Sequence, residues 1–176
     1  MDFQNQKLKD FLKELGSKKG APGGGAAAAL AASAGAALVE MVARLNDARF
    51  KKTSGSAAQA SLLRKRMQGM MQKDARAFKK IKAAYKTRVR QPHAWQRALK
   101  EGAETPFEIC ESSRKAAHLA EKEKSRTSDW LESDRLEALV LLRAAFESAR
   151  LNVEINLREI KDTAFVNSMK GKLRWQ

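Results

Sequence analysis

The segment APGGGAAAALAASAGAALVE, residues 21–40, decides the fold expected for this chain. Alanine is the strongest helix former, so a helix should follow the three glycines and continue to about Leu45 or Asn46. Small residues repeat every four positions along two adjoining stripes, which are Ala27, Ala31 and Gly35, and Ala28, Ala32 and Ala36. Because such stripes let neighbouring backbones approach closely, we predict a helix that is buried on most sides of a tight bundle.

The rest of the chain also favours helices, because alanine, leucine, lysine, arginine and glutamate dominate it. The pattern predicts further helices over residues 3–15, 57–85, 92–122, 133–156 and 159–169, with a polar, irregular link over 123–131. Ser133 is the expected cap of the fifth helix, and Pro106 is expected to kink or break the fourth near Thr105. We therefore predict one all-α domain over residues 1–176, a compact bundle of about five to six helices.

The composition excludes several classes of protein. The 176 residues are 43% hydrophobic and 31% charged, which excludes intrinsic disorder. The single cysteine, Cys110, excludes an intramolecular disulfide and is typical of a protein in a reducing cytoplasm. The best apolar run, residues 26–39, is shorter than the roughly 20 residues that a membrane span needs. We therefore expect a cytoplasmic protein with no membrane span.

Positive charge is concentrated in one segment. The formal net charge is +15, and residues 51–100 contain 15 Lys and Arg but one acid, Asp74. A field of one sign attracts anions such as nucleic acid or acidic small molecules. The segment has no aromatic residues beyond Phe78 and Tyr85 and no recognised nucleic-acid motif. Nucleic-acid binding therefore stays open as an alternative that the motifs do not favour, and a solvated basic surface is the plainer interpretation.

A candidate anion site precedes the alanine-rich helix, at Pro22, Gly23, Gly24 and Gly25. Glycines at a helix start expose backbone N–H groups, and the helix dipole adds positive potential there. Such a terminus can hold a carboxylate, a phosphate or a developing negative charge. The alternative is a flexible turn that lets two backbones pass.

Asp74 is a candidate catalytic base or ligand anchor. It lies one turn before Phe78, near the apolar side of its predicted helix. We expect the surrounding cations to keep its carboxyl group ionised. The alternative is a salt bridge within the helix, to Lys73, Arg76 or a residue four positions along.

Two asparagines and a second aspartate complete the candidate site. Asn152 and Asn156 are four residues apart, so both amides lie on one helix face. They can recognise the polar edge of a ligand ring, or they can cap the helix end. Asp134 can be a first-turn acid that complements the helix dipole. His93 and His118 have no acid or cysteine partner at ligand spacing, so no metal is expected.

The order of several short motifs is more specific than any one of them. These motifs are Lys9-Asp10-Phe11-Leu12, Ala21-Pro22-Gly23-Gly24-Gly25, Glu40-Met41-Val42-Ala43-Arg44-Leu45, Asp74-Ala75-Arg76-Ala77-Phe78, Thr105-Pro106-Phe107, Ser133-Asp134 and Asn152-Val153-Glu154-Ile155-Asn156-Leu157. In this order, over nearly the whole chain, the sequence resembles the formiminotransferase-cyclodeaminase C-terminal domain family. That family includes stand-alone methenyltetrahydrofolate cyclohydrolases.

The resemblance implies a fold, a partner and a reaction. It implies an all-α bundle that forms a homodimer, with a folate site around the glycine loop. The reaction is then hydrolysis of the methenyl bridge of tetrahydrofolate, or cyclisation of formiminotetrahydrofolate with loss of ammonia. Neither needs a prosthetic group or a metal, and Asp74 and Asp134 are the matching carboxylates for proton transfer. The small-molecule partner is a tetrahydrofolate derivative, which serves as substrate.

The same resemblance gives the basic segment a role. Cellular folates carry glutamate tails, so the implied ligand is itself a polyanion, and Lys79, Lys80 and Lys82 are the candidates for holding that tail. The alternative from another class is a non-catalytic or repurposed family member, a basic helical module that binds nucleic acid or another anionic ligand.

Overall fold

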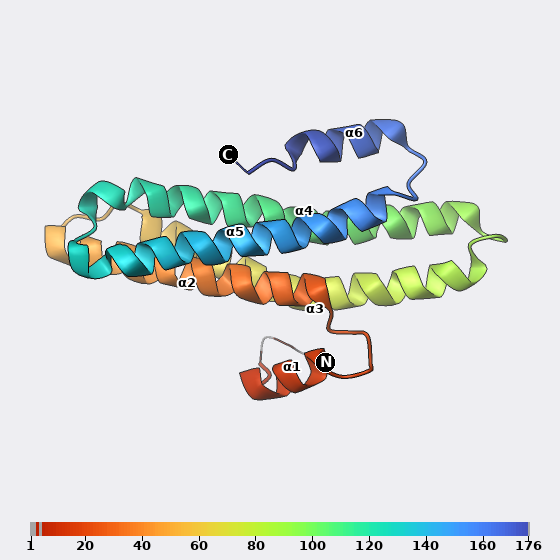
Figure 1. Cartoon of the computed structure of the whole chain (residues 1–176), viewed down its shortest axis with the longest axis horizontal. Coiled ribbons are helices and arrows are strands. Elements are labelled where there is room, and N and C mark those ends of the chain that lie inside the picture. The colour runs from red at the N-terminus through yellow and green to blue at the C-terminus, as the bar shows by residue number, and fades with distance from the viewer. Residues whose placement is uncertain (1–2, 4, 176) are drawn as a thin grey trace.

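Four long helices form the body of the protein, whose computed structural model describes residue 3 and residues 5–175. They are α2 (Gly24–Phe50), α3 (Ser56–Thr87), α4 (Pro92–Lys122) and α5 (Asp129–Leu157). The chain runs back and forth along the bundle, and α2 and α4 each pack against both α3 and α5 (Figure 1). This is the up-and-down arrangement that short connections between helices favour. The all-α prediction is confirmed.

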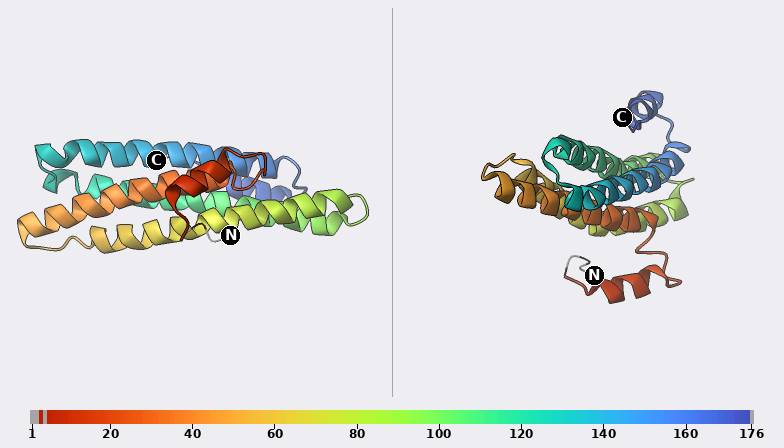
Figure 2. Two further views of the ribbon diagram at one scale, coloured as in Figure 1. Left: turned by 90° about the horizontal axis from the view of Figure 1, so that it is seen from below. Right: turned by 60° about the vertical axis from the view of Figure 1, so that its left-hand side comes forward.

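Two short helices lie on opposite sides of this bundle (Figure 2). Helix α1 (Leu8–Leu15) buries Phe11, whose ring meets Phe3 edge to face with 5.5 Å between ring centroids. Helix α6 (Thr163–Lys172) is followed by Trp175, which packs on Phe146 of α5 at 5.2 Å in the same manner. The first pair thus joins the segment before α1 to that helix, and the second joins the segment after α6 to the bundle.

Small residues set the spacing of the central helices. A Cβ atom added at Gly35 would lie 2.8 Å from the Leu142 side chain of α5, so α2 and α5 approach as closely as they do because no side chain intervenes. The stripe of Ala28, Ala32 and Ala36 is buried in the core, whereas Ala27 and Ala31 remain half-buried. The two stripes therefore serve packing within the chain.

Helix α2 is long and apolar enough to cross a membrane by length and composition alone, with a mean hydropathy of 1.7 in its best window. More than half of that window, 56%, is buried inside the bundle. The core helix of a globular protein has the same properties, because it is apolar on most sides. Its contacts with α3, α4 and α5 identify α2 as such a core helix.

Several predicted helix boundaries were wrong. Helix α1 begins at Leu8 rather than at Phe3. Helix α5 begins at Asp129, so Ser133 lies inside the helix and does not cap it. The earlier start follows from the acids Asp129 and Glu132, which complement the dipole of the first turn. Helix α6 begins at Thr163, where the side chain of Asp162 accepts a hydrogen bond from the Phe165 backbone N–H at 3.0 Å.

The link over 123–131 is more ordered than predicted. It contains the 3-10 turn η1 (Lys124–Arg126), which is held by the fully buried carboxylate of Glu123. That carboxylate accepts a hydrogen bond from Asn46 Nδ2 at 2.9 Å, and Arg126 bridges it to Asp47. A buried charge must be paired, and this pairing joins the α4–α5 link to the end of α2.

Candidate active site

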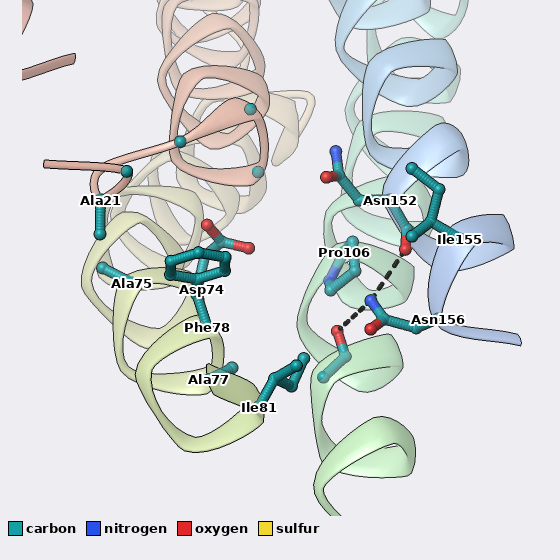
Figure 3. Close-up of a pocket in the computed structure, with 15 residues that line it drawn as sticks. Ala21, Asp74, Ala75, Ala77, Phe78, Ile81, Pro106, Asn152, Ile155 and Asn156 are labelled. Atoms are coloured by element: carbon teal, nitrogen blue, oxygen red, sulfur yellow. Dashed lines mark hydrogen bonds between the residues drawn. The ribbon is translucent and has the colours of Figure 1, made fainter. Parts of the chain in front are cut away.

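A cavity of about 310 Å³ opens between the start of α2 and the facing sides of α3, α4 and α5 (Figure 3). Its lining combines backbone, apolar and polar groups, from Gly20, Ala21, Gly23, Gly24, Gly25, Asp74, Ala75, Ala77, Phe78, Ile81, Gly102, Pro106, Asn152, Ile155 and Asn156. The fold thus brings together most of the predicted site, namely the three glycines, Asp74, Asn152 and Asn156. Pro22 is buried and does not line the cavity.

The glycine loop places the start of α2 against Asp74. Gly23 is the N-cap residue, its carbonyl accepts from Ala27 N–H at 3.0 Å, and no side chain of its own caps the helix. The Asp74 carboxylate takes that role from α3, because it accepts a hydrogen bond from Ala26 N–H. A Cβ atom at Gly25 would overlap this carboxylate, so the arrangement requires glycine there.

The pKa of Asp74 is set by its burial and not by the cations near it in the sequence. Burial raises the pKa of its carboxyl group to about 6, and the hydrogen bond from Ala26 N–H offsets only part of that rise. The predicted alternative, a salt bridge within α3, is also absent from the described part of the chain, where Lys73 pairs with Glu108 of α4 instead. Asp74 is the one titratable side chain among the described residues that line the cavity.

Pro106 explains how the amides are oriented. Proline has no N–H, so the carbonyl of Gly102, four residues earlier, loses its helical donor. Asn156 Nδ2 donates to that carbonyl at 3.3 Å and to the carbonyl of Asn152 at 2.9 Å (Figure 3). Of the two expectations near Thr105, a kink or a break, the break is wrong: α4 continues through Pro106, and the freed carbonyl is satisfied by a residue of α5.

Asn152 is held in the same way, since its Nδ2 donates to the carbonyl of Ser148 at 3.0 Å. Neither asparagine caps the end of α5, where Arg158 follows the last residue, Leu157. Asn152 donates one N–H and Asn156 donates two to backbone carbonyls, and the amide oxygen of each side chain is a further group that can accept a hydrogen bond.

The remaining predicted site residues lie elsewhere. Asp134 stands 18 residues before Asn152 on α5, about 27 Å along the helix axis, and does not line the cavity. Lys79 and Lys82 line a neighbouring groove of about 240 Å³. Lys80 points away from both and pairs with Glu101 of α4 at 2.7 Å.

The basic segment is partly neutralised by acids from other helices. Arg64 pairs with Glu40 of α2 at 2.9 Å, and Arg66 and Lys73 both pair with Glu108 of α4. The groove beside the cavity keeps a surplus, because Lys19, Arg76, Lys79 and Lys82 line it and no acid does. The groove next to the cavity therefore carries a positive field.

Other reactive side chains take no part in the site. Cys110 is buried, and its burial raises the pKa of the thiol to about 12, which leaves it unreactive. In the part of the chain that the structure describes, no three side chains of His, Cys, Asp or Glu gather at metal-binding distance.

Some residues of the site were not predicted from the sequence. Gly20, Gly102 and Ile155 line the cavity, and Lys19 and Arg76 line the groove. Gly102 carries the clearest signal, because an isolated glycine inside a helix usually permits a close approach. A Cβ atom there would overlap Ile81 of α3.

The fold and the site define a class: an all-helical bundle with a cavity between its helices that the carboxyl group of Asp74 lines. The chain belongs to the formiminotransferase-cyclodeaminase family, whose sequence model matches residues 7–174. The family resemblance predicted from the motifs is thereby confirmed.

Two relatives show how far the likeness extends. The chain is 31% identical to a methenyltetrahydrofolate cyclohydrolase from Methylorubrum extorquens, over 96% of this chain and 88% of that one. Its fold matches that of a formiminotetrahydrofolate cyclodeaminase from Thermotoga maritima with a TM-score of 0.88 at 31% identity, over 97% and 87% of the two chains.

Proposed function

We propose that this chain is a folate one-carbon enzyme, a methenyltetrahydrofolate cyclohydrolase or a formiminotetrahydrofolate cyclodeaminase, with its catalytic centre in the cavity at Asp74. The observation that carries the assignment is the half-buried Asp74 carboxyl group at the start of α2, in a chain that aligns with a cyclohydrolase over 96% of its length. A tetrahydrofolate derivative is then the substrate.

Both reactions pass through a tetrahedral carbon and require a proton to move. In hydrolysis, water adds to the methenyl carbon and loses a proton as the C–O bond forms; one of the two C–N bonds of the bridge then breaks, and the released nitrogen gains a proton. In cyclisation, the secondary amine nitrogen that joins the pterin to the aminobenzoyl ring attacks the formimino carbon, and the imino nitrogen leaves as ammonia after gaining a proton. A carboxyl group with a pKa of about 6 exchanges protons readily near neutral pH, which suits either step.

The surroundings of Asp74 fit the pterin end of a folate. The amide oxygens of Asn152 and Asn156 are suited to accept from ring N–H and amino groups, and Gly24 and Gly25 offer backbone N–H groups at a helix start. Asp134 remains the second matching carboxylate of the family resemblance, and its distance from the cavity makes it the natural comparison for Asp74.

An absorbance assay tests the assignment. Adding the protein to methenyltetrahydrofolate should speed the loss of methenyl absorbance, and adding it to formiminotetrahydrofolate should release ammonia if deamination is the reaction. The relative rates identify the activity. If neither substrate turns over and the protein instead retains DNA in a salt-sensitive manner, it is a basic binding module rather than this enzyme.

The groove lined by Lys79 and Lys82 is proposed to hold the glutamate tail. Reversing both to glutamate should raise the KM for polyglutamylated folate about tenfold at low salt, since each exposed ion pair contributes up to ~1 kcal/mol. The KM for monoglutamylated folate should change less, and the difference should shrink as salt rises.

Lys80→Glu is the matched control for the tail prediction. Compared with the single variant Lys79→Glu, it makes the same charge change on the same helix, but Lys80 faces Glu101 outside the groove. Equal effects of the Lys79/Lys82 reversal on the two folates would rule out a tail site there. If Lys80→Glu loses the preference for polyglutamylated folate to the same extent, the overall positive charge of the helix, and not the groove, is responsible.

We also propose a homodimer, supported now by the surface of α5 rather than by the small-residue stripes. Large apolar side chains lie exposed along one face of α5, at Leu136, Val140, Leu151 and Ile155. Exposed apolar patches of this extent mark interaction surfaces.

Light scattering at micromolar concentration should give twice the mass of one chain, and Val140→Lys should shift that mass toward the monomer. A wild-type monomer would refute the proposal. We also propose that the protein is cytoplasmic.

A further inference from the structure

Phe78 is the wall that the cavity and the cationic groove share. It lines both spaces, together with Ala21 and Ala75, and follows Asp74 by one turn of α3. The Phe78 and Asp74 side chains both come from α3 and line the cavity (Figure 3). On the other side, Lys79 and Lys82 line the groove.

The ring of Phe78 is held in place but is not covered. The side chain is 42% exposed, although neighbouring Ala75 is buried. Its edge packs near the backbone of Gly20, where an added Cβ atom would lie 3.7 Å from the Phe78 ring. Gly20 has a φ of 73°, a backbone conformation that favours glycine, so the loop passes close to this ring. An aromatic ring that remains exposed between two binding spaces is suited to stack on a planar group.

The proposed substrate has a planar group at the corresponding place. In a folate, the p-aminobenzoyl ring joins the pterin, which carries the reacting carbon, to the glutamate tail. With the reacting carbon beside Asp74 and the glutamates beside Lys79 and Lys82, this ring must cross from the cavity to the groove. The wall between those two spaces is Phe78.

We propose that Phe78 is a specificity-determining residue that stacks on the p-aminobenzoyl ring and thereby positions the reacting carbon beside Asp74. This inference rests on the proposed function and deepens it, because it assigns the segment of the substrate between its two charged or polar ends. It makes the aminobenzoyl group, and not the pterin alone, part of what the enzyme recognises.

The test compares two fragments of the substrate with the full chain of the protein. The probes are p-aminobenzoyltriglutamate and a tetrahydropterin that lacks the aminobenzoyl group, with dissociation constants measured by ligand-observed NMR. Phe78→Leu should weaken binding of the first probe about tenfold, in line with the contribution of an aromatic stacking partner. Binding of the second probe should change less than twofold, and Phe78→Tyr should restore binding of the first.

Tyr85→Leu is the matched control. Tyr85 is also a half-exposed aromatic residue on α3, but it packs against Trp95 and Arg88 and lines neither space. This variant should bind both probes like the wild type. With methenyltetrahydrofolate, Phe78→Leu should raise KM about tenfold, and Tyr85→Leu should not.

The outcomes separate this inference from the proposed function. If the wild type turns over folate but Phe78→Leu binds p-aminobenzoyltriglutamate as tightly as the wild type, the stacking role is overturned. Equal weakening of both probes would also overturn it, because that result describes a general loss of structure. A wild type that turns over neither folate substrate refutes the proposed function itself.

Discussion

Replacing Asp74 by asparagine is expected to lower kcat by about 10²–10⁴-fold on both monoglutamylated and polyglutamylated folate, the usual contribution of a positioned acid or base. Asparagine keeps the shape of the side chain and can still accept from Ala26 N–H, but it cannot exchange a proton. Asp134 lies about 27 Å along α5 from Asn152, so Asp134→Asn should retain wild-type kcat. If instead Asp134→Asn abolishes turnover and Asp74→Asn does not, the catalytic carboxylate is Asp134.

The pH dependence of the wild type should carry the same signature. Burial raises the pKa of Asp74 to about 6, so the ionised form that accepts a proton from water is lost as the pH falls through 6. Hydrolysis by the free enzyme, followed as kcat/KM, should decline on that acidic side. The residual activity of Asp74→Asn should lack this limb, and a limb that persists in the variant would belong to another group.

Stability measurements distinguish loss of chemistry from loss of fold. Because the pKa of Asp74 is raised from 3.8 to about 6 on folding, the folded state binds more protons than the unfolded state between these values. The stability that Asp74 contributes is therefore fully present below about pH 4 and is lost as the pH rises through 6. Above pH 7, Asp74→Asn should be more stable than the wild type by ~1–3 kcal/mol, measured by urea unfolding. A less stable variant would contradict this account.

Gly25→Ala is expected to have the second largest effect, a loss of kcat of about 100-fold. The added Cβ would overlap the Asp74 carboxylate, which must rotate away and give up both its place in the cavity and its bond to Ala26 N–H. The fold should tolerate the change, because the overlap is relieved by turning a side chain and alanine favours the helix. We therefore expect the free energy of unfolding to change by no more than about 1 kcal/mol. The melting temperature should then stay within a few degrees of the wild-type value.

Gly24→Ala is the matched comparison for this prediction. A Cβ atom at Gly24 would lie 3.7 Å from Asn152 Nδ2, an ordinary van der Waals distance, so the loss of kcat should be much smaller. Wild-type turnover in Gly25→Ala would mean that the observed position of Asp74 is not the catalytic one.

The sequence by itself determined the fold class, because helix-forming residues, apolar spacing and the alanine-rich segment all act locally along the chain. It also indicated the glycine loop, Asp74 and the two asparagines, whose residue types point to ligand chemistry. Helix starts were less predictable: Ser133 has the right chemistry for a cap, but the acids Asp129 and Glu132 allowed α5 to begin earlier.

The roles of these residues depend on tertiary contacts. The cations near Asp74 in the sequence were expected to govern its carboxyl group, yet burial against α2 raises its pKa to about 6, because desolvation depends on neighbours from other helices. Pro106 should break an isolated helix, but Asn156 from α5 satisfies the carbonyl that Pro106 leaves free. Lys79 and Lys80 are adjacent in sequence, and the helix turns one toward the groove and the other toward Glu101. Each outcome depends on a contact between distant segments, which local sequence does not specify.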